Sequence, residues 1–350
     1  MDITREELYR WCSLPLEQLQ DHSERKVNLI LKEDRPAAMR LIGNMMADEI
    51  LENNRLGKLT KWVLPAGPTD EYDVLIERVN RERISRRNLH VFHMDDCLDW
   101  AGRPYPVADT YESLEGTMNA AFYGRIDPDL NVPVEQRHWP RINDLDAIDN
   151  LVEEMGGVDT LWAGVGAKGL VAFCEAPRPY THRITLEEFA RSKTRIVNLN
   201  DDTIVALSQR SFGACYDRVP PRAVTLGFKA MLTAKRAILM IATGAWKQTV
   251  VRVALSGSAR KCSGSPAPAA IIFFSASPSV PASDDSSRGW ITSQLSLSSA
   301  TRIDPGAGGL AFNTAWRAAR SASLLKRERT IYRKALRKRF SRARSSSQLA

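Results

Sequence analysis

The chain has 350 residues, of which 43% are hydrophobic and 26% are charged, and it is long enough for one large α/β domain with appendages. Its net charge of +8 is concentrated at one end, because residues 256–350 hold 16 of the 49 basic residues but only 4 of the 41 acidic ones. Residues 1–255 carry a net charge of −4, so the positive net charge of the whole chain is no evidence that the main body binds nucleic acid.

The first residues predict a helix and no export signal. Thr4 and Glu7 have the spacing of a capping box, and we expect an N-terminal helical extension over 1–33. The charged start is unlike a secretion signal, and no apolar run approaches the ~20 residues of a membrane span. The five cysteines form no Cys-x-x-Cys pair, so the sequence predicts a reduced, cytoplasmic protein without a membrane partner, metal or cofactor.

Helical and extended patterns then alternate along residues 34–255, which we expect to form one domain. The helical pattern begins at residues 34–53 and recurs at 71–87, 144–155 and 246–255. Short apolar runs separate these stretches at 62–64, 89–94, 160–163 and 237–243. This alternation predicts an α/β fold with an open, mostly parallel, doubly wound (Rossmann-like) sheet flanked by helices. In such a sheet the ligand binds at the carboxyl ends of the strands.

The composition changes after Leu255. Residues 256–350 contain 20 serines together with Pro, Ala and Gly clusters, and we expect them to form a low-complexity basic tail that is disordered or translated in a different frame from its ancestor's. The apolar run 271–274 is a candidate for one further strand of the sheet, and 311–344 for a basic helix. A disordered tail would be dispensable for ligand binding.

Four segments that follow the predicted strands carry polar or small residues. The turn containing Ala66, Gly67 and Thr69 is typical of backbone that approaches an anion. Asp95 and Asp96 follow the second strand and suit a proton acceptor, a metal ligand or a helix cap. After the third strand, 164–169 matches G-x-G-x-x-G without a long helix behind it, which favours a flexible loop over a small ligand. Lys247 follows the fourth strand and suits a phosphate.

In their order along the chain, these segments resemble the glucosamine-6-phosphate deaminase and 6-phosphogluconolactonase superfamily, and particularly its deaminase branch. Residues 64–69 resemble the phosphate loop L-P-T-G-G-T-P, and 92–96 resemble F-N-M-D-E. Residues 164–177 resemble G-G-V-G-x-D-G-H-I-A-F-N-E-P. Three further matches lie at 193–203, 219–227 and 244–247.

The resemblance implies roles for single residues. Asp95 corresponds to the aspartate that moves a proton from C2 to C1 of the open sugar, and Glu175 to the glutamate of the relay that opens the ring. The relay aspartate and histidine are replaced by Lys168 and Leu170, so ring opening is expected to be impaired. Phosphate binding is implied for Ala66, Gly67, Thr69, Lys247 and, with a one-residue shift, Arg210.

Two functions follow as alternatives. The first is an isomerase or deaminase that acts on an aldose or amino-sugar 6-phosphate in carbohydrate metabolism, with Asp95 as the proton carrier. The second is a sugar-phosphate-binding or regulatory protein that has lost the chemistry. The phosphorylated sugar is the expected partner in both, a specific nucleic acid is not expected, and assembly into a homo-oligomer is left open.

Overall fold

The computed structural model describes residues 4–15, 18–23, 25, 27–67, 69–166, 169–175, 184–241, 247–256 and 269–275, all of which belong to the compact unit Met1–Ser279. Lys168 lies outside these residues, and so does most of the predicted tail, including the basic helix expected at 311–344. No helix among the described residues is long and apolar enough to span a membrane.

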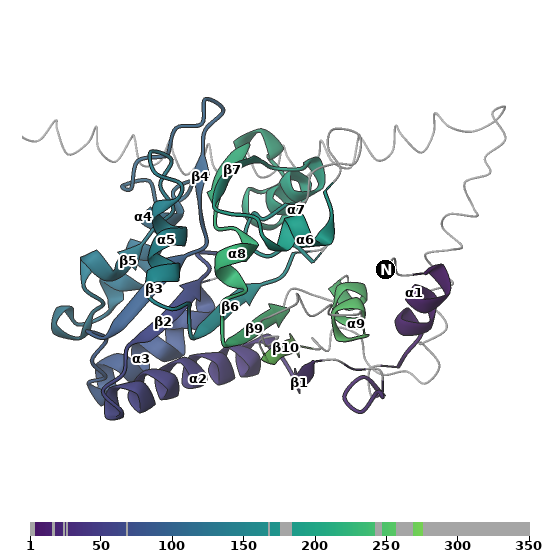
Figure 1. Cartoon of the computed structure of the whole chain (residues 1–350), viewed down its shortest axis with the longest axis horizontal. Helices are drawn as coiled ribbons and strands as arrows, with labels where there is room; N and C mark the ends of the chain where they lie inside the picture. Colours follow the sequence, from purple (N-terminus) through teal and green to yellow (C-terminus); the bar gives the residue numbers. More distant parts are fainter. Residues whose placement is uncertain are drawn as a thin grey trace, which may run out of the picture. The chain divides into compact units, whose positions relative to one another are not determined.

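A seven-stranded sheet forms the centre of this unit, and each neighbouring pair of its strands is parallel (Figure 1). Its strands, in spatial order, are β1 (Asn28–Lys32), β10 (Ala269–Ser275), β9 (Arg236–Ile241), β6 (Thr160–Gly164), β2 (Thr60–Leu64), β3 (Leu89–His93) and β5 (Arg137–His138). The predicted α/β class and mostly parallel sheet are therefore confirmed, and the four predicted strands are β2, β3, β6 and β9.

The sheet extends beyond both ends of the predicted 34–255 domain. β1 lies within the segment 1–33 that the sequence assigned to a helical extension, and β10 lies within the tail. The apolar run 271–274 does pair with the sheet, because β10 is inserted between β1 and β9. A strand that is short and surrounded by low-complexity sequence has no local signal strong enough to fix a domain boundary.

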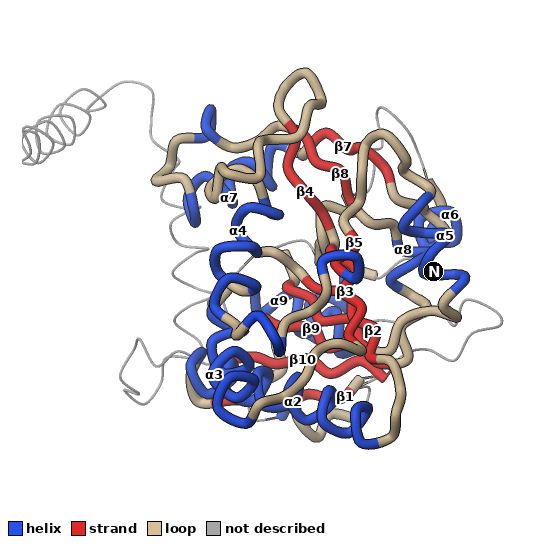
Figure 2. Tube along the Cα trace, turned by 90° about the vertical axis from the view of Figure 1, so that its left-hand side faces the viewer, coloured by secondary structure: helices blue, strands red, loops and turns tan. Residues whose placement is uncertain are grey.

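A second sheet has no counterpart among the predicted elements. It is three-stranded and antiparallel, with β8 (Arg222–Thr225) between β4 (Asp95–Leu98) and β7 (Arg195–Asn198). Figure 2 shows these strands side by side beyond the end of β3. Met94 joins the two sheets, since its N–H donates to the carbonyl of Leu64 at 3.1 Å and its carbonyl accepts from Leu226 at 2.7 Å.

The first two α-helices begin at side-chain caps. The capping box of Thr4 and Glu7 is formed at α1 (Arg5–Cys12), and Asp34 caps α2 (Arg35–Arg55) by accepting from the N–H of Ala37 at 2.7 Å. The remaining α-helices are α3 (Asp73–Glu82), α4 (Leu114–Ala121), α5 (Ala147–Glu154), α6 (Leu186–Ala190), α7 (Asp201–Ser211), α8 (Phe228–Met231) and α9 (Gln248–Ser256). Short 3-10 turns are η2 (Asp70–Tyr72), η3 (Tyr123–Arg125), η4 (Pro128–Leu130), η5 (Val134–Gln136) and η6 (Tyr216–Arg218).

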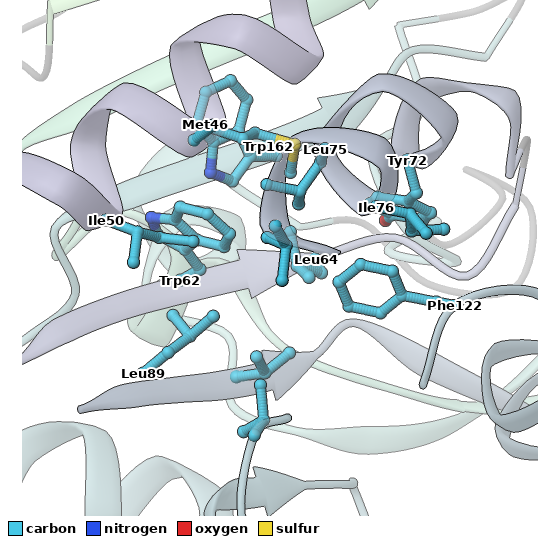
Figure 3. Close-up of a cluster of buried hydrophobic side chains, with 14 of the residues drawn as sticks. Met46, Ile50, Trp62, Leu64, Tyr72, Leu75, Ile76, Leu89, Phe122 and Trp162 are labelled. Atoms are coloured by element: carbon cyan, nitrogen blue, oxygen red, sulfur yellow. The ribbon is translucent and has the colours of Figure 1, made fainter. Parts of the chain in front are cut away.

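Two apolar clusters fill the two faces of the parallel sheet. Alternate side chains of the strands belong to different clusters, as the pleat requires: Trp62 and Leu64 pack with α2 and α3, whereas Val63 packs with α5, α8 and α9. Trp62 and Trp162 meet edge to face at 5.7 Å between ring centroids in the first cluster (Figure 3). Because helices cover both faces of the sheet, the ends of the strands are where a ligand can reach it.

Candidate functional site

The strand order reverses between β2 and β6, and at the carboxyl ends of such strands a crevice is expected. These strands are neighbours in the sheet, but β3 follows β2 on one side whereas β9 lies beyond β6 on the other. The connections after two such strands turn away from each other, and this is where doubly wound sheets hold their ligands. The turn after β2 and the glycine-rich segment after β6 both start here.

The turn after β2 keeps a small, open backbone. Ala66 is buried, whereas Gly67 is exposed and a Cβ added there would meet nothing within 4 Å. Tyr72 fixes both ends of the turn, since its hydroxyl donates to the carbonyl of Pro65 at 2.6 Å and its N–H donates to the carbonyl of Thr69 at 3.1 Å. The chain then enters η2 before α3 begins, so a single 3-10 turn separates this loop from the helix that the sequence placed directly after it.

Lys247 stands at the start of the last helix of the domain, next to β6. Its ammonium group donates a hydrogen bond to the carbonyl of Val165, which directly follows β6. Only 4% of the residue is exposed, and burial lowers the pKa of Lys247 to about 8, with Arg210 and Arg35 as further causes. The preceding residues 242–246, which carry most of the predicted G-x-x-K match, lie outside the described part.

The three cations Lys247, Arg210 and Arg35 lie close enough to repel one another. Arg210 belongs to the last turn of α7, and its pKa is lowered by desolvation and then by Arg35. Arg35 begins α2 and was not among the residues singled out in the sequence. The guanidinium group of Arg35 donates two hydrogen bonds to the carboxylate of Asp70, from Nε at 2.7 Å and from Nη2 at 2.6 Å. The only sequence signal for this contact is a cation at the start of a helix.

Asp95 opens β4, one residue beyond the end of β3. The residue is 7% exposed, and burial, followed by the neighbouring charge of Asp96, raises the pKa of Asp95 to about 7. A backbone hydrogen bond from Phe173 acts in the opposite direction. At neutral pH this carboxyl group therefore exists in both its protonated and its ionised form.

Asp96 has a different environment from Asp95. One of its carboxylate oxygens accepts from the N–H of Leu114 at 2.8 Å, at the first residue of α4, and from its neighbour Cys97 at 2.9 Å. Burial raises the pKa of Asp96 to about 6. Of the three roles that the sequence left open for this pair, helix capping thus applies to Asp96. The described residues hold no group of three His, Cys, Asp or Glu side chains arranged for a metal ion.

Glu175 lies two residues after Phe173, whose backbone bonds to Asp95. The N–H of Glu175 donates to the carbonyl of Phe173 at 2.7 Å, and the backbone of Phe173 bonds to the carboxylate of Asp95. Glu175 is buried, its Oε1 accepts from the N–H of Asn200 at 3.0 Å, and its carbonyl accepts from Arg195 at 3.3 Å. The residue assigned to proton transfer and the one assigned to the relay are thus both linked to Phe173.

The glycine-rich segment after β6 is a loop in its described residues, 164–166 and 169–175. The N–H of Gly166 donates to the carbonyl of Leu170 at 2.7 Å, and that of Gly169 donates to Gly166 at 3.1 Å. Gly169 and Ala172 have φ angles of +85° and +53°, so this backbone follows a turn that a dinucleotide-binding helix would not allow. Leu170 is half-buried and has no group that titrates.

A separate cavity of about 560 Å³ lies near η3–η5. Its lining includes Tyr123, Asn131 and Arg137, and none of the residues predicted from the sequence for catalysis or phosphate binding. The chemistry-bearing residues are gathered at the strand ends instead.

Comparison with known proteins bears on the family and the fold of the chain. A protein named glucosamine-6-phosphate deaminase from Bacillus velezensis is 31% identical over 203 residues, 55% of this chain and 74% of the relative. One of the same name from Caenorhabditis elegans is 28% identical over 233 residues, 65% of this chain and 80% of the relative. The solved structure of a monomeric glucosamine-6-phosphate deaminase has a TM-score of 0.52 and 19% identity, and the match covers 71% of this chain and 96% of that one. No family model matches the chain.

Proposed function

We propose a sugar-phosphate activity for this chain, which belongs to the glucosamine-6-phosphate deaminase family. The proposed substrate is an aldose or amino-sugar 6-phosphate of the glucosamine 6-phosphate type. The proposed reaction is proton transfer between C2 and C1 of the open-chain sugar, with release of ammonia when C2 carries an amine. Such a reaction belongs to carbohydrate and amino-sugar metabolism.

The observation that supports this proposal best is the environment of Asp95. A general base works well when its pKa lies near the working pH, and burial brings the pKa of Asp95 to about 7. The hydrogen bond from the backbone of Phe173 to its carboxylate restrains the side chain. A carboxyl group that is partly ionised at neutral pH can both accept and return a proton.

The proposed steps balance without a cofactor. Asp95 accepts the proton from C2 of the open-chain sugar, and the electron pair of that C–H bond forms the C1–C2 double bond. The π pair of the C1 aldehyde moves to its oxygen, which takes a proton from the C2 ammonium group, so that an enolamine results. The protonated Asp95 then returns the proton to C1, which leaves a ketimine at C2. Water adds to the ketimine carbon and ammonia leaves, giving the ketose 6-phosphate. Lys247, Arg210 and the turn at 65–69 would hold the phosphate at the other end of the chain.

Ring opening is the step that this chain is expected to perform poorly. Leu170 occupies the position of the relay histidine, and a leucine neither donates nor accepts a proton. Lys168 occupies the position of the relay aspartate, outside the described residues. We therefore propose that the open-chain form of the sugar is the effective substrate. The same substitution at Leu170 favours a second candidate function, a sugar-phosphate-binding or regulatory protein without turnover.

Incubation of the full chain with glucosamine 6-phosphate distinguishes the two candidates. Ammonia and fructose 6-phosphate are assayed for the unmodified protein and for Asp95→Asn, which keeps the shape of the side chain but removes the base. A matched control is Asp99→Asn, because Asp99 directly follows the far end of the same strand and bonds to Arg103. Product that appears in the control but not in Asp95→Asn supports the enzyme. Tight binding with no product from any protein supports the regulatory alternative.

A further inference from the structure

The positive charge near the turn at 65–69 is larger than that of one anion-binding lysine. Lys247, Arg210 and Arg35 each carry one positive charge, and after desolvation the neighbouring cations further lower the pKa of Lys247 and of Arg210. Asp70 offsets one of these charges through its double contact with Arg35. Repulsion among buried or half-buried cations is unfavourable unless an anion compensates it.

The charged form of a second carboxyl group at this place is disfavoured by burial. Glu71 follows Asp70 and is buried, and this burial raises its pKa well above the ordinary range. The three cations and Asp70 together leave a net charge of +2. A phosphate monoester at neutral pH carries a charge of about −1.5 to −2, which is the charge that this arrangement requires.

Arg35 is accessible enough to bind such an anion directly. Its side chain is 30% exposed and that of Asp70 is 43% exposed, so the pair stands at the surface of the crevice and a ligand can reach it. A guanidinium group has five N–H donors in a planar fork, and it can hold a carboxylate and a phosphate oxygen at the same time. Asp70 directly follows Thr69, so the ion pair brings Arg35 next to the end of the proposed phosphate loop.

We propose that Arg35 is a third phosphate-binding cation of this site and that, with it, the site selects doubly charged phosphate monoesters over singly charged analogues. The inference rests on the proposed function, because it assumes that Lys247 and the turn at 65–69 bind the phosphate. A half-exposed ion pair contributes little to folding, so loss of Arg35 is expected to act on the ligand more than on stability.

Calorimetric titration of the full chain tests the proposal with two ligands that differ in charge. Glucosamine 6-phosphate approaches a dianion at pH 7.5 or so, whereas glucosamine 6-sulfate is a monoanion. Arg35→Ala should weaken binding of the phosphate by about tenfold or more, as expected for loss of a charged hydrogen bond, and binding of the sulfate clearly less. Arg35→Lys keeps the charge and should recover part of the loss. Arg40→Ala is the matched control, because Arg40 is an exposed residue of the same helix and should leave both affinities unchanged.

Replacement of Asp70, the ion-pair partner of Arg35, tests whether Arg35 binds the phosphate or only holds the loop. Asp70→Asn breaks the pair but keeps Arg35, and it also removes a negative charge, so phosphate affinity should be retained or increased. Loss of affinity in Asp70→Asn as large as that in Arg35→Ala would overturn the proposal, because Arg35 would then only hold the loop. Equal losses for phosphate and sulfate in Arg35→Ala would overturn the selectivity.

Failure of the proposed function would look different. If Lys247→Ala left the phosphate affinity intact, the assumed phosphate site would be wrong, whatever Arg35 does. If the unmodified chain bound inorganic phosphate in an Arg35-dependent way but not glucosamine 6-phosphate, the sugar would be wrong and the Arg35 site would stand. Thermal unfolding of each variant, compared with the unmodified chain, identifies any that has lost its fold; for such a variant Arg35→Lys and Asp70→Asn decide the outcome.

Discussion

Replacement of Asp95 by asparagine is expected to abolish the proposed proton transfer and, at alkaline pH, to stabilise the fold. In the folded chain, burial raises the pKa of Asp95 from an ordinary value of 3.8 to about 7. A carboxyl group whose pKa is higher in the folded than in the unfolded chain makes its full contribution to stability at pH values below the unfolded pKa. That contribution is lost as the pH rises from about 4 through about 7, because the ionised group must then be buried.

The magnitude follows from the same pKa difference. Each pKa unit corresponds to about 1.4 kcal/mol, so the difference between 3.8 and about 7 amounts to about 4 kcal/mol once the pH exceeds the folded value. Asparagine does not titrate, and its amide oxygen can still accept from the backbone of Phe173. Asp95→Asn should therefore gain little at pH 4 and up to about 4 kcal/mol of unfolding free energy, relative to the unmodified protein, at pH 8.

Urea unfolding of both proteins between pH 4 and pH 8 measures this difference directly. Asp99→Asn serves as the control, since hydrogen bonds from the backbone and side chain of Arg103 lower the pKa of Asp99 and its replacement should show no gain with rising pH. A constant stability difference across the whole pH range, or a variant that is less stable than the unmodified protein at pH 8, would refute the inference that Asp95 is a buried, partly protonated carboxyl group. In the activity assay, kcat/KM should rise with pH to a plateau above about 7 if the ionised form of Asp95 is the base.

Three further outcomes are expected. Lys247→Ala should weaken the binding of phosphorylated ligands by about 1.5–3 kcal/mol and leave the binding of non-phosphorylated sugars almost unchanged in the same titration. Equal losses of affinity for both kinds of ligand would mean that Lys247 acts through folding. Lys168→Asp combined with Leu170→His should raise ammonia release by about 10²–10⁴-fold, the usual contribution of acid-base assistance, and an unchanged rate would show that the relay positions are not limiting. A chain ending at Leu255 lacks β10 and should unfold at lower urea concentration than one ending at Ser279, whereas equal midpoints would show that β10 adds nothing to the sheet.

The sequence alone was sufficient for the family and for the architecture of the main body. Apolar runs of period two and helical stretches of period 3.6 predict the alternation of β2, β3, β6 and β9 with helices, because these patterns depend on neighbours within a few residues. Capping residues fixed the starts of α1 and α2 for the same reason. The motif order predicts Asp95 and Glu175 as residues of one site, and in the structure both bond to the backbone of Phe173.

The tertiary structure decided what depends on residues distant in the chain. β10 enters the sheet because β1 and β9 offer it two parallel partners, a pairing over more than 200 residues that no local pattern reveals. The second sheet consists of strands of four residues, too short for a periodic signal. Arg35 and Asp70 are 35 positions apart and meet only when α2 lies beside the turn after β2. The raised pKa of Asp95 has the same origin, since the desolvation of a carboxyl group is set by everything that packs around it, and its own sequence neighbours supply only part of that environment.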